Sequence, residues 1–224
     1  MGSSRVDRTP READSSWSMA WRERPVAIVV PGEGIVLEGL WQSGDARAAV
    51  IAPPHPEFGG SLENPAVAEI AHGFYKAGWA SLRFNWRGVG ASQGSVTGDP
   101  ESAEADFGAA LKQLLATIEV PVIGAGYSFG AATALRVALR EPILRELFLV
   151  APPVSMIRDL PLEQLGRPVH VIVGSEDTFA PFRELSELLT PLANARLEVI
   201  PEADHFFALK GLAELAELAR AALG

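Results

Sequence analysis

Short apolar segments alternate with helical segments along most of the 224 residues. Such alternation favours βαβ units, in which helices join parallel strands and cover both faces of the sheet. The first three apolar segments follow one another closely, so we expect antiparallel strands or hairpins there. The sequence therefore predicts an α/β fold with a mostly parallel, eight-stranded sheet and helices on both faces. The predicted strands are Val26–Val30, Ile35–Trp41, Ala48–Ala52, Trp79–Phe84, Val120–Ala125, Leu147–Ala151, Val169–Val173 and Leu197–Ile200, and the predicted helices are Asn64–Ala77, Ser102–Thr117, Phe129–Arg140, Pro181–Leu189 and Leu212–Leu223.

Length and composition fit one domain over residues 21–224. Apolar residues make up 48% and charged residues 21%, which is typical of a globular protein. A chain of this length buries about 70% of its unfolded surface, so it needs no metal or disulfide to hold it. The segment 152–168 has room for a short helix such as Leu160–Leu165 but not for a large cap domain. Residues 1–20 are expected to form a mobile N-terminal arm.

Charge and residue usage exclude several classes of function. The net charge is −9, from 19 basic and 28 acidic residues, and an acidic surface repels the phosphates of nucleic acids. Cysteine is absent, which rules out disulfides, thiolate ligands and a cysteine nucleophile. No apolar run approaches the roughly 18 residues of a membrane span, and the N-terminus lacks the apolar region of a secretory signal. We expect a cytoplasmic protein with no metal, no cofactor, and neither nucleic acid nor membrane as partner.

A serine lies between a predicted strand and a predicted helix, in the pattern G-x-S-x-G of Gly126-Tyr127-Ser128-Phe129-Gly130. This pattern is typical of a nucleophile elbow, where the serine sits on a strained turn and the two glycines avoid a collision. The same pattern recurs at Gly90–Gly94 around Ser92. No helix follows Ser92 directly, so we interpret it as a loop serine and Ser128 as the nucleophile.

A serine nucleophile needs a general base, and the chain offers four histidines. His205 follows the last predicted strand and precedes the last helix, at the sheet edge where Ser128 is expected. His72 lies within a predicted helix and His170 within a buried strand, so both are interpreted as structural. His55 follows the third strand and is expected to brace its loop.

The base needs an acid that orients its ring. Asp177 follows the seventh predicted strand, whereas Glu176 projects differently and Asp204 is adjacent in sequence to His205. We therefore predict Asp177 as the acid. The resulting order of Ser128, Asp177 and His205 along the chain is nucleophile, acid, base.

The negative charge of a tetrahedral intermediate needs aimed hydrogen-bond donors. The backbone N–H of Phe129, at the start of a helix, is the first candidate. The second is expected from the loop after the third strand, where Pro56 has no N–H and either Glu57 or Phe58 can donate.

Taken together, these segments resemble the α/β-hydrolase family, and the likeness spans residues 26–222. A loop H-P-x-F-G-G and a second segment F-N-x-R-G-x-G-x-S are similar to those of small, lidless bacterial hydrolases near the dienelactone-hydrolase-like proteins. The resemblance implies a serine hydrolase, most often an esterase. Dienelactone hydrolases use a cysteine nucleophile, which this chain lacks. Pro56 replaces a glycine common in the family, and Asn85 replaces a common aspartate. The segments that carry the likeness are His55–Gly60, Phe84–Ser92, Gly126–Gly130 and those containing Asp177 and His205.

These observations predict a carboxylesterase-like enzyme that cleaves small short-chain esters through an acyl-enzyme. Alternatives are a thioesterase, a peptidase or acyltransferase of the same fold, and a catalytically idle ligand-binding protein. A nucleotide-binding oxidoreductase is disfavoured, because the glycines at 124, 126 and 130 are spaced one residue too far for G-x-G-x-x-G. Candidate pocket residues, some of which can equally pack in the core, are Tyr127, Val154, Met156, Phe179 and Phe206, together with Phe58 and Phe129.

Overall fold

The computed structural model of the protein describes residues 22–221. The predicted arm over residues 1–20 lies outside the described residues. Within the described part, no helix combines the length and the apolar character needed to cross a bilayer.

Eight strands form one twisted sheet in the order β1-β2-β4-β3-β5-β6-β7-β8. β2 runs antiparallel to its neighbours β1 and β4, and the pairs from β4 through β3 to β8 are parallel. The predicted mostly parallel, eight-stranded sheet is thus confirmed. The strands are β1 (Glu23–Val29), β2 (Val36–Gln42), β3 (Ala48–Ala52), β4 (Ala80–Phe84), β5 (Val122–Tyr127), β6 (Leu144–Val150), β7 (Val169–Gly174) and β8 (Ala195–Ile200).

The expectation for the third strand is wrong. β3 does not form a hairpin with β2 but lies between β4 and β5, parallel to both. All five of its residues are buried, as expected for a strand covered by helices on both faces. Pairing with two distant strands, rather than the short link from β2, determines its place.

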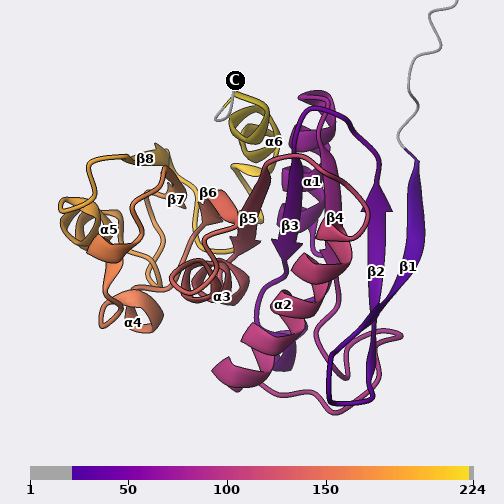
Figure 1. The fold of residues 1–224 in the computed structure, drawn as a ribbon. Coiled ribbons are helices and arrows are strands. Elements are labelled where there is room, and N and C mark those ends of the chain that lie inside the picture. Colours follow the sequence, from indigo (N-terminus) through magenta and orange to yellow (C-terminus); the bar gives the residue numbers. More distant parts are fainter. Residues whose placement is uncertain (1–21, 222–224) are drawn as a thin grey trace, which may run out of the picture.

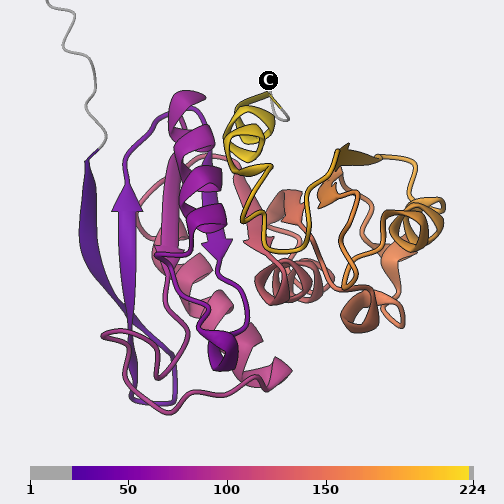
Figure 2. The same ribbon diagram turned by 180° about the vertical axis from the view of Figure 1, so that it is seen from behind.

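Helices cover both faces of the sheet (Figures 1 and 2). α1 and α6 pack together on one face, where Gly73 lets the backbones approach: a Cβ there would lie 2.3 Å from the carbonyl oxygen of Ala216. α2 and α3 lie on the opposite face. The longer helices are α1 (Pro65–Lys76), α2 (Pro100–Leu115), α3 (Phe129–Ala138), α5 (Phe182–Leu189) and α6 (Leu212–Ala221).

The connection between β6 and β7 is short. It contains a single turn of helix, α4 (Val154–Ile157), and a 3-10 turn at Leu162–Gln164, within the predicted Leu160–Leu165. No cap domain covers the sheet edge at this point of the described chain. The loops after β5, β7 and β8 meet at that edge, since the carboxyl ends of parallel strands lie together.

Candidate active site

Ser128 occupies a strained turn between β5 and α3. Its backbone has φ 55° and ψ −119°, a conformation that residues with a side chain rarely adopt. The flanking glycines make the turn possible: a Cβ on Gly126 would lie 2.5 Å from the carbonyl carbon of Gly130, and a Cβ on Gly130 would lie 2.3 Å from the carbonyl oxygen of Ala52. The close packing at these glycines holds the turn in place, and with it the residue that carries the hydroxyl.

Three side chains from separate loops form a hydrogen-bonded chain. The Oγ of Ser128 lies 2.9 Å from Nε2 of His205, and Nδ1 of the same ring lies 2.8 Å from Oδ2 of Asp177. All three residues are buried. With the carboxylate on Nδ1, the favoured neutral tautomer carries its proton there, and Nε2 is left to accept the serine proton.

Asp177 divides its two oxygens between the ring and the backbone. While Oδ2 faces His205, Oδ1 accepts hydrogen bonds of 2.8 Å from the N–H groups of Phe179 and Ala180. Of the other acids considered, Glu176 is exposed, and Asp204 accepts a hydrogen bond from the N–H of Phe206 in its own turn. The structure therefore brings Asp177 to the ring.

Hydrogen bonds join the loop after β7, which carries Asp177, to the loop after β8, which carries His205. The N–H of Glu176 donates to the carbonyl oxygen of Ala203 at 2.9 Å, and the N–H of Glu202 donates to Oγ of Ser175 at 2.8 Å. Gly174 has no room for a side chain, because a Cβ would lie 2.1 Å from the carbonyl oxygen of Ala203. These contacts fix the two loops as one unit.

The loop after β3 lies next to Ser128 through aromatic contacts. The ring of His55 packs between those of Phe58 and Phe129, at centroid distances of 4.8 and 4.7 Å. Phe129 is the first residue of α3, so its N–H is not used within the helix. The N–H of Glu57 donates to Nδ1 of His55 at 3.3 Å, and that of Phe58 to the His55 carbonyl oxygen at 3.1 Å. The choice of second oxyanion donor stays a prediction.

The candidate pocket residues lie in two different environments. Tyr127 and Val154 are buried in the hydrophobic core, and Met156 is partly buried against it. Phe179 and Phe206 are exposed at the surface beside His205. Sequence reasoning did not foresee that the hydroxyl of Tyr127 donates to the backbone carbonyl oxygen of His205 at 2.7 Å. No local pattern signals that contact, because it joins residues far apart in the sequence.

Ser92, in the second G-x-S-x-G segment, has a structural role. Its Oγ donates to the carbonyl oxygen of Asn85 at 3.0 Å and accepts from the N–H of Glu38 at 2.9 Å. The hydroxyl therefore links the loop after β4 to strand β2, and no histidine is among these partners.

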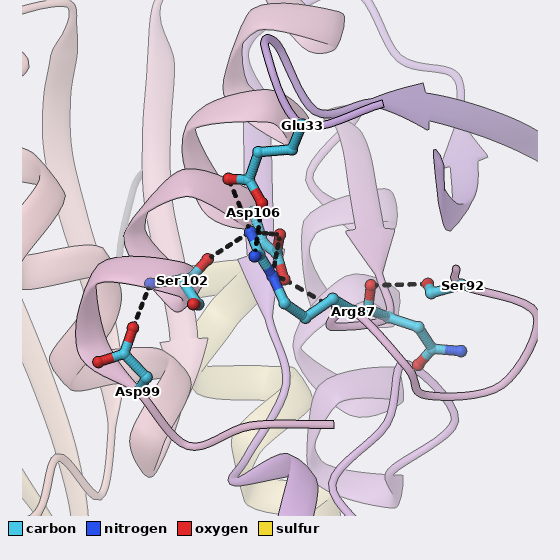
Figure 3. A network of polar contacts seen from close by, with 7 residues as sticks. Glu33, Arg87, Ser92, Asp99, Ser102 and Asp106 are labelled. Atoms are coloured by element: carbon cyan, nitrogen blue, oxygen red, sulfur yellow. Dashed lines mark hydrogen bonds and ion pairs between the residues drawn. The ribbon is translucent and has the colours of Figure 1, made fainter. Parts of the chain in front are cut away.

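The same loop is anchored to α2 by an arginine (Figure 3). The Arg87 side chain makes charge-assisted hydrogen bonds to Asp106, which is buried, and to Glu33, with closest distances of 2.8 and 2.6 Å. Although burial lowers the pKa of Arg87, these carboxylates raise it overall. Asp99 begins α2 by accepting a hydrogen bond from the N–H of Ser102. This network holds the F-N-x-R-G segment and contributes no reacting group.

The remaining histidines lie away from the serine. His170 is buried in β7, where its Nε2 lies 2.9 Å from Oε1 of Glu146, and His72 lies in α1. Over residues 22–221, no group of three or more His, Cys, Asp or Glu side chains is arranged to hold a metal ion.

The sheet order, the strained serine and the short connection after β6 define an α/β hydrolase without a lid. A family model described as serine aminopeptidase, S33, matches residues 63–167. An α/β serine hydrolase homologue from Coxiella burnetii superposes with a TM-score of 0.81 at 29% identity, covering 90% of this chain and 97% of that one. A protein of Xanthomonas campestris, described as an α/β serine hydrolase without lid, gives a TM-score of 0.78 at 26% identity, covering 88% and 92%.

The chain belongs to the α/β-hydrolase superfamily. It also matches the uncharacterized protein RP471 of Rickettsia prowazekii, with 29% identity over 180 residues. The match covers 75% of each chain. The predicted fold class and the predicted family resemblance are thus confirmed.

Proposed function

We propose that the protein hydrolyses small carboxylic esters with short acyl chains through an acyl-enzyme, as a carboxylesterase of the cytoplasm. One observation carries the proposal: the hydroxyl of Ser128, the ring of His205 and the carboxylate of Asp177 lie in one line of hydrogen bonds of 2.9 and 2.8 Å. A nucleophile–base contact with an oriented base is the arrangement that acyl transfer requires.

The first half of the reaction forms the acyl-enzyme. Ser128 Oγ bonds to the carbonyl carbon of the ester while its proton passes to Nε2 of His205. The negative charge that develops on the carbonyl oxygen is held by the N–H of Phe129 and by that of Glu57 or Phe58, which gives up its present contact with His55. The bond from the carbonyl carbon to the leaving oxygen then breaks, and that oxygen takes the proton from Nε2.

Water completes the cycle. It gives a proton to Nε2 as its oxygen bonds to the acyl carbon, and the bond to Ser128 Oγ breaks as the serine recovers that proton. Asp177 keeps the ring in the tautomer that both halves need and stabilises the imidazolium that forms during each half.

The preference for short acyl chains follows from the short connection between β6 and β7. Its single helical turn, α4, offers no long covered channel for an extended chain. We expect p-nitrophenyl acetate and butyrate to be cleaved faster than longer esters. A rate that climbs steadily up to a twelve-carbon acyl chain would contradict the proposal.

A fluorophosphonate probe tests the central claim directly, because it reacts with an activated serine. The native protein is expected to be labelled, and Ser128→Ala is not. The variant Ser92→Ala serves as the matched control, since it removes the serine of the other G-x-S-x-G segment and is expected to keep the label. An unlabelled native protein would indicate an idle, ligand-binding member of the superfamily.

A peptidase activity is the second candidate, favoured by the description of the family model that matches residues 63–167. The same three side chains serve an amide as well as an ester. Comparing p-nitroanilides with the matching p-nitrophenyl esters separates the two, and we expect the esters to be cleaved and the anilides to resist.

A further inference from the structure

Two phenylalanine rings stand exposed beside the proposed base. The ring centroids of Phe179 and Phe206 lie 4.8 and 5.5 Å from that of His205, and 6.3 Å from each other. Phe179 is 55% exposed and Phe206 is 64% exposed, whereas His205 is 7% exposed. The rings therefore form an apolar, aromatic rim around an imidazole that is almost covered.

The backbone that carries these rings is fixed by hydrogen bonds. The N–H of Phe179 donates to Oδ1 of Asp177 at 2.8 Å, and its carbonyl oxygen accepts from the N–H of Val154 at 3.0 Å. The N–H of Phe206 donates to Oδ1 of Asp204 at 3.0 Å. The two rings are therefore exposed to solvent while their backbone is fixed, as is typical of a preformed binding surface.

The position of the rim relative to Nε2 determines which part of a substrate it can meet. In the proposed reaction Nε2 of His205 gives its proton to the leaving oxygen, so that oxygen comes within hydrogen-bond distance of the ring. Atoms attached to the leaving oxygen are then brought near the imidazole ring, whose aromatic neighbours are Tyr127, Phe179 and Phe206, and of these only the last two are exposed. The acyl part is bonded to Ser128 Oγ, on the other side of the bond that breaks.

We propose that the rim is a subsite for an aromatic leaving group, and that the preferred substrates are short-chain esters of arylmethyl alcohols. The proposal rests on the proposed function of the same site. Aromatic rings favour offset or edge-to-face contacts with one another beyond simple burial of apolar area, and the two rings are themselves nearly perpendicular at 78°. An aryl ring in the substrate completes such a cluster.

A third exposed ring provides an internal control. Phe58 is 86% exposed and packs on His55, whose ring in turn contacts Phe129. It has the same chemistry as Phe179 and Phe206 but lies in the loop proposed to supply the second oxyanion donor, and Phe58→Leu keeps the backbone N–H of that position. Removing its ring is therefore expected to leave the discrimination between leaving groups unchanged.

The test compares benzyl acetate with cyclohexylmethyl acetate, which share the acyl group and differ in the aromatic character of the leaving alcohol. Each kcat/KM is divided by the rate of alkaline hydrolysis of the same ester, which removes intrinsic reactivity. We expect the native protein to prefer benzyl acetate by about 3- to 10-fold, the scale of aromatic pair contacts. In the double variant Phe179→Leu/Phe206→Leu the preference falls to near unity, while Phe58→Leu keeps it.

Because both esters use the same base, a loss of His205 positioning lowers both rates together and leaves the ratio unchanged. A native ratio near unity, or a ratio that survives the double substitution, would overturn the aryl subsite and leave the proposed function standing. Labelling by the fluorophosphonate without cleavage of either ester would overturn the aryl subsite, and cleavage of p-nitrophenyl acetate would then decide whether the proposed function stands. Absence of both labelling and cleavage would overturn the two proposals together.

Discussion

The hydroxyl of Tyr127 donates a hydrogen bond of 2.7 Å to the backbone carbonyl oxygen of His205. Tyr127 immediately precedes the proposed nucleophile and is almost completely buried. Burial, with the negative charges of Asp177 and Asp204, raises the pKa of the phenol above its ordinary value, so the hydroxyl stays protonated and able to donate. The residue before the proposed nucleophile thus anchors the loop that carries His205 through a hydrogen bond.

The variant Tyr127→Phe tests this positioning role. It keeps the ring but leaves the buried carbonyl oxygen of His205 without its donor, which is expected to lower the free energy of unfolding by about 1–3 kcal/mol. We expect kcat for p-nitrophenyl butyrate to fall about 10-fold with KM unchanged, since a small displacement of a reacting group is enough for that loss. The control is Tyr75→Phe, in α1. If the variant is less stable but its kcat is unchanged, Tyr127 contributes to stability only and does not position His205.

The variant Asp177→Asn tests the orientation of the base. The N–H groups of Phe179 and Ala180 hold Oδ1, so the amide nitrogen of the variant is directed at Nδ1 of His205. Nδ1 then accepts, the proton moves to Nε2, and the ring no longer accepts from Ser128. We expect kcat to fall about 10⁴-fold with little change in the melting temperature. Activity within tenfold of the native protein would exclude Asp177 as the orienting acid.

The surroundings of Gly130, in the elbow, and of Gly108, in α2, predict opposite effects of an alanine substitution on stability. In Gly130→Ala the new Cβ would lie 2.3 and 2.4 Å from the carbonyl oxygens of Ala52 and Pro53, which belong to the backbone of the sheet edge. We expect the free energy of unfolding to fall by about 3 kcal/mol. In α2, Gly108 faces open space, and Gly108→Ala is expected to raise it by about 1 kcal/mol, since alanine favours the helix. Urea denaturation measures both, and similar effects would contradict the packing of the elbow.

The carboxylate of Glu38 favours an amide rather than a second carboxylate at position 85. Its Nδ2 donates to Oε2 of Glu38 at 2.8 Å, while its Oδ1 accepts from the N–H of Leu62 at 2.7 Å. Asn85→Asp places two carboxylates together and is expected to lower the free energy of unfolding by about 2 kcal/mol at neutral pH. Adding Glu38→Gln removes one of the two charges and is expected to restore part of it, because Oε2 of Glu38 also accepts from the N–H of Ala91 at 2.9 Å and an amide nitrogen there loses that contact. A double variant no more stable than Asn85→Asp would contradict this pairing.

Strand and helix periodicity predicted nearly all elements of the fold, because the helices are amphipathic and most residues of the central strands are apolar. Errors arose where distant residues decide. Strand β6 begins at Leu144 rather than Leu147, and its charged Glu146 is accommodated by Arg47 and His170. Helix α4 is four residues long, which is too short to show a period in the sequence.

The candidate site was predictable to the extent that strand ends converge. The positions of Ser128, Asp177 and His205 after three parallel strands indicated one edge, and the structure brings their side chains within hydrogen-bond distance. The exposure of side chains could not be predicted in the same way. Tyr127 is the last residue of β5 and Phe179 lies in the loop after β7, so both are aromatic residues near strand ends, yet Tyr127 is buried and Phe179 is exposed to solvent.

The short connection between β6 and β7 has a kinetic consequence. A mobile lid over a nucleophile has to open before a substrate can enter the site. Within residues 22–221 a single helical turn stands between β6 and β7, so the described part of the chain has no lid that must open before a substrate enters. Hydrolysis is therefore expected to follow simple saturation as the ester concentration rises, with no jump in rate where the ester begins to form micelles.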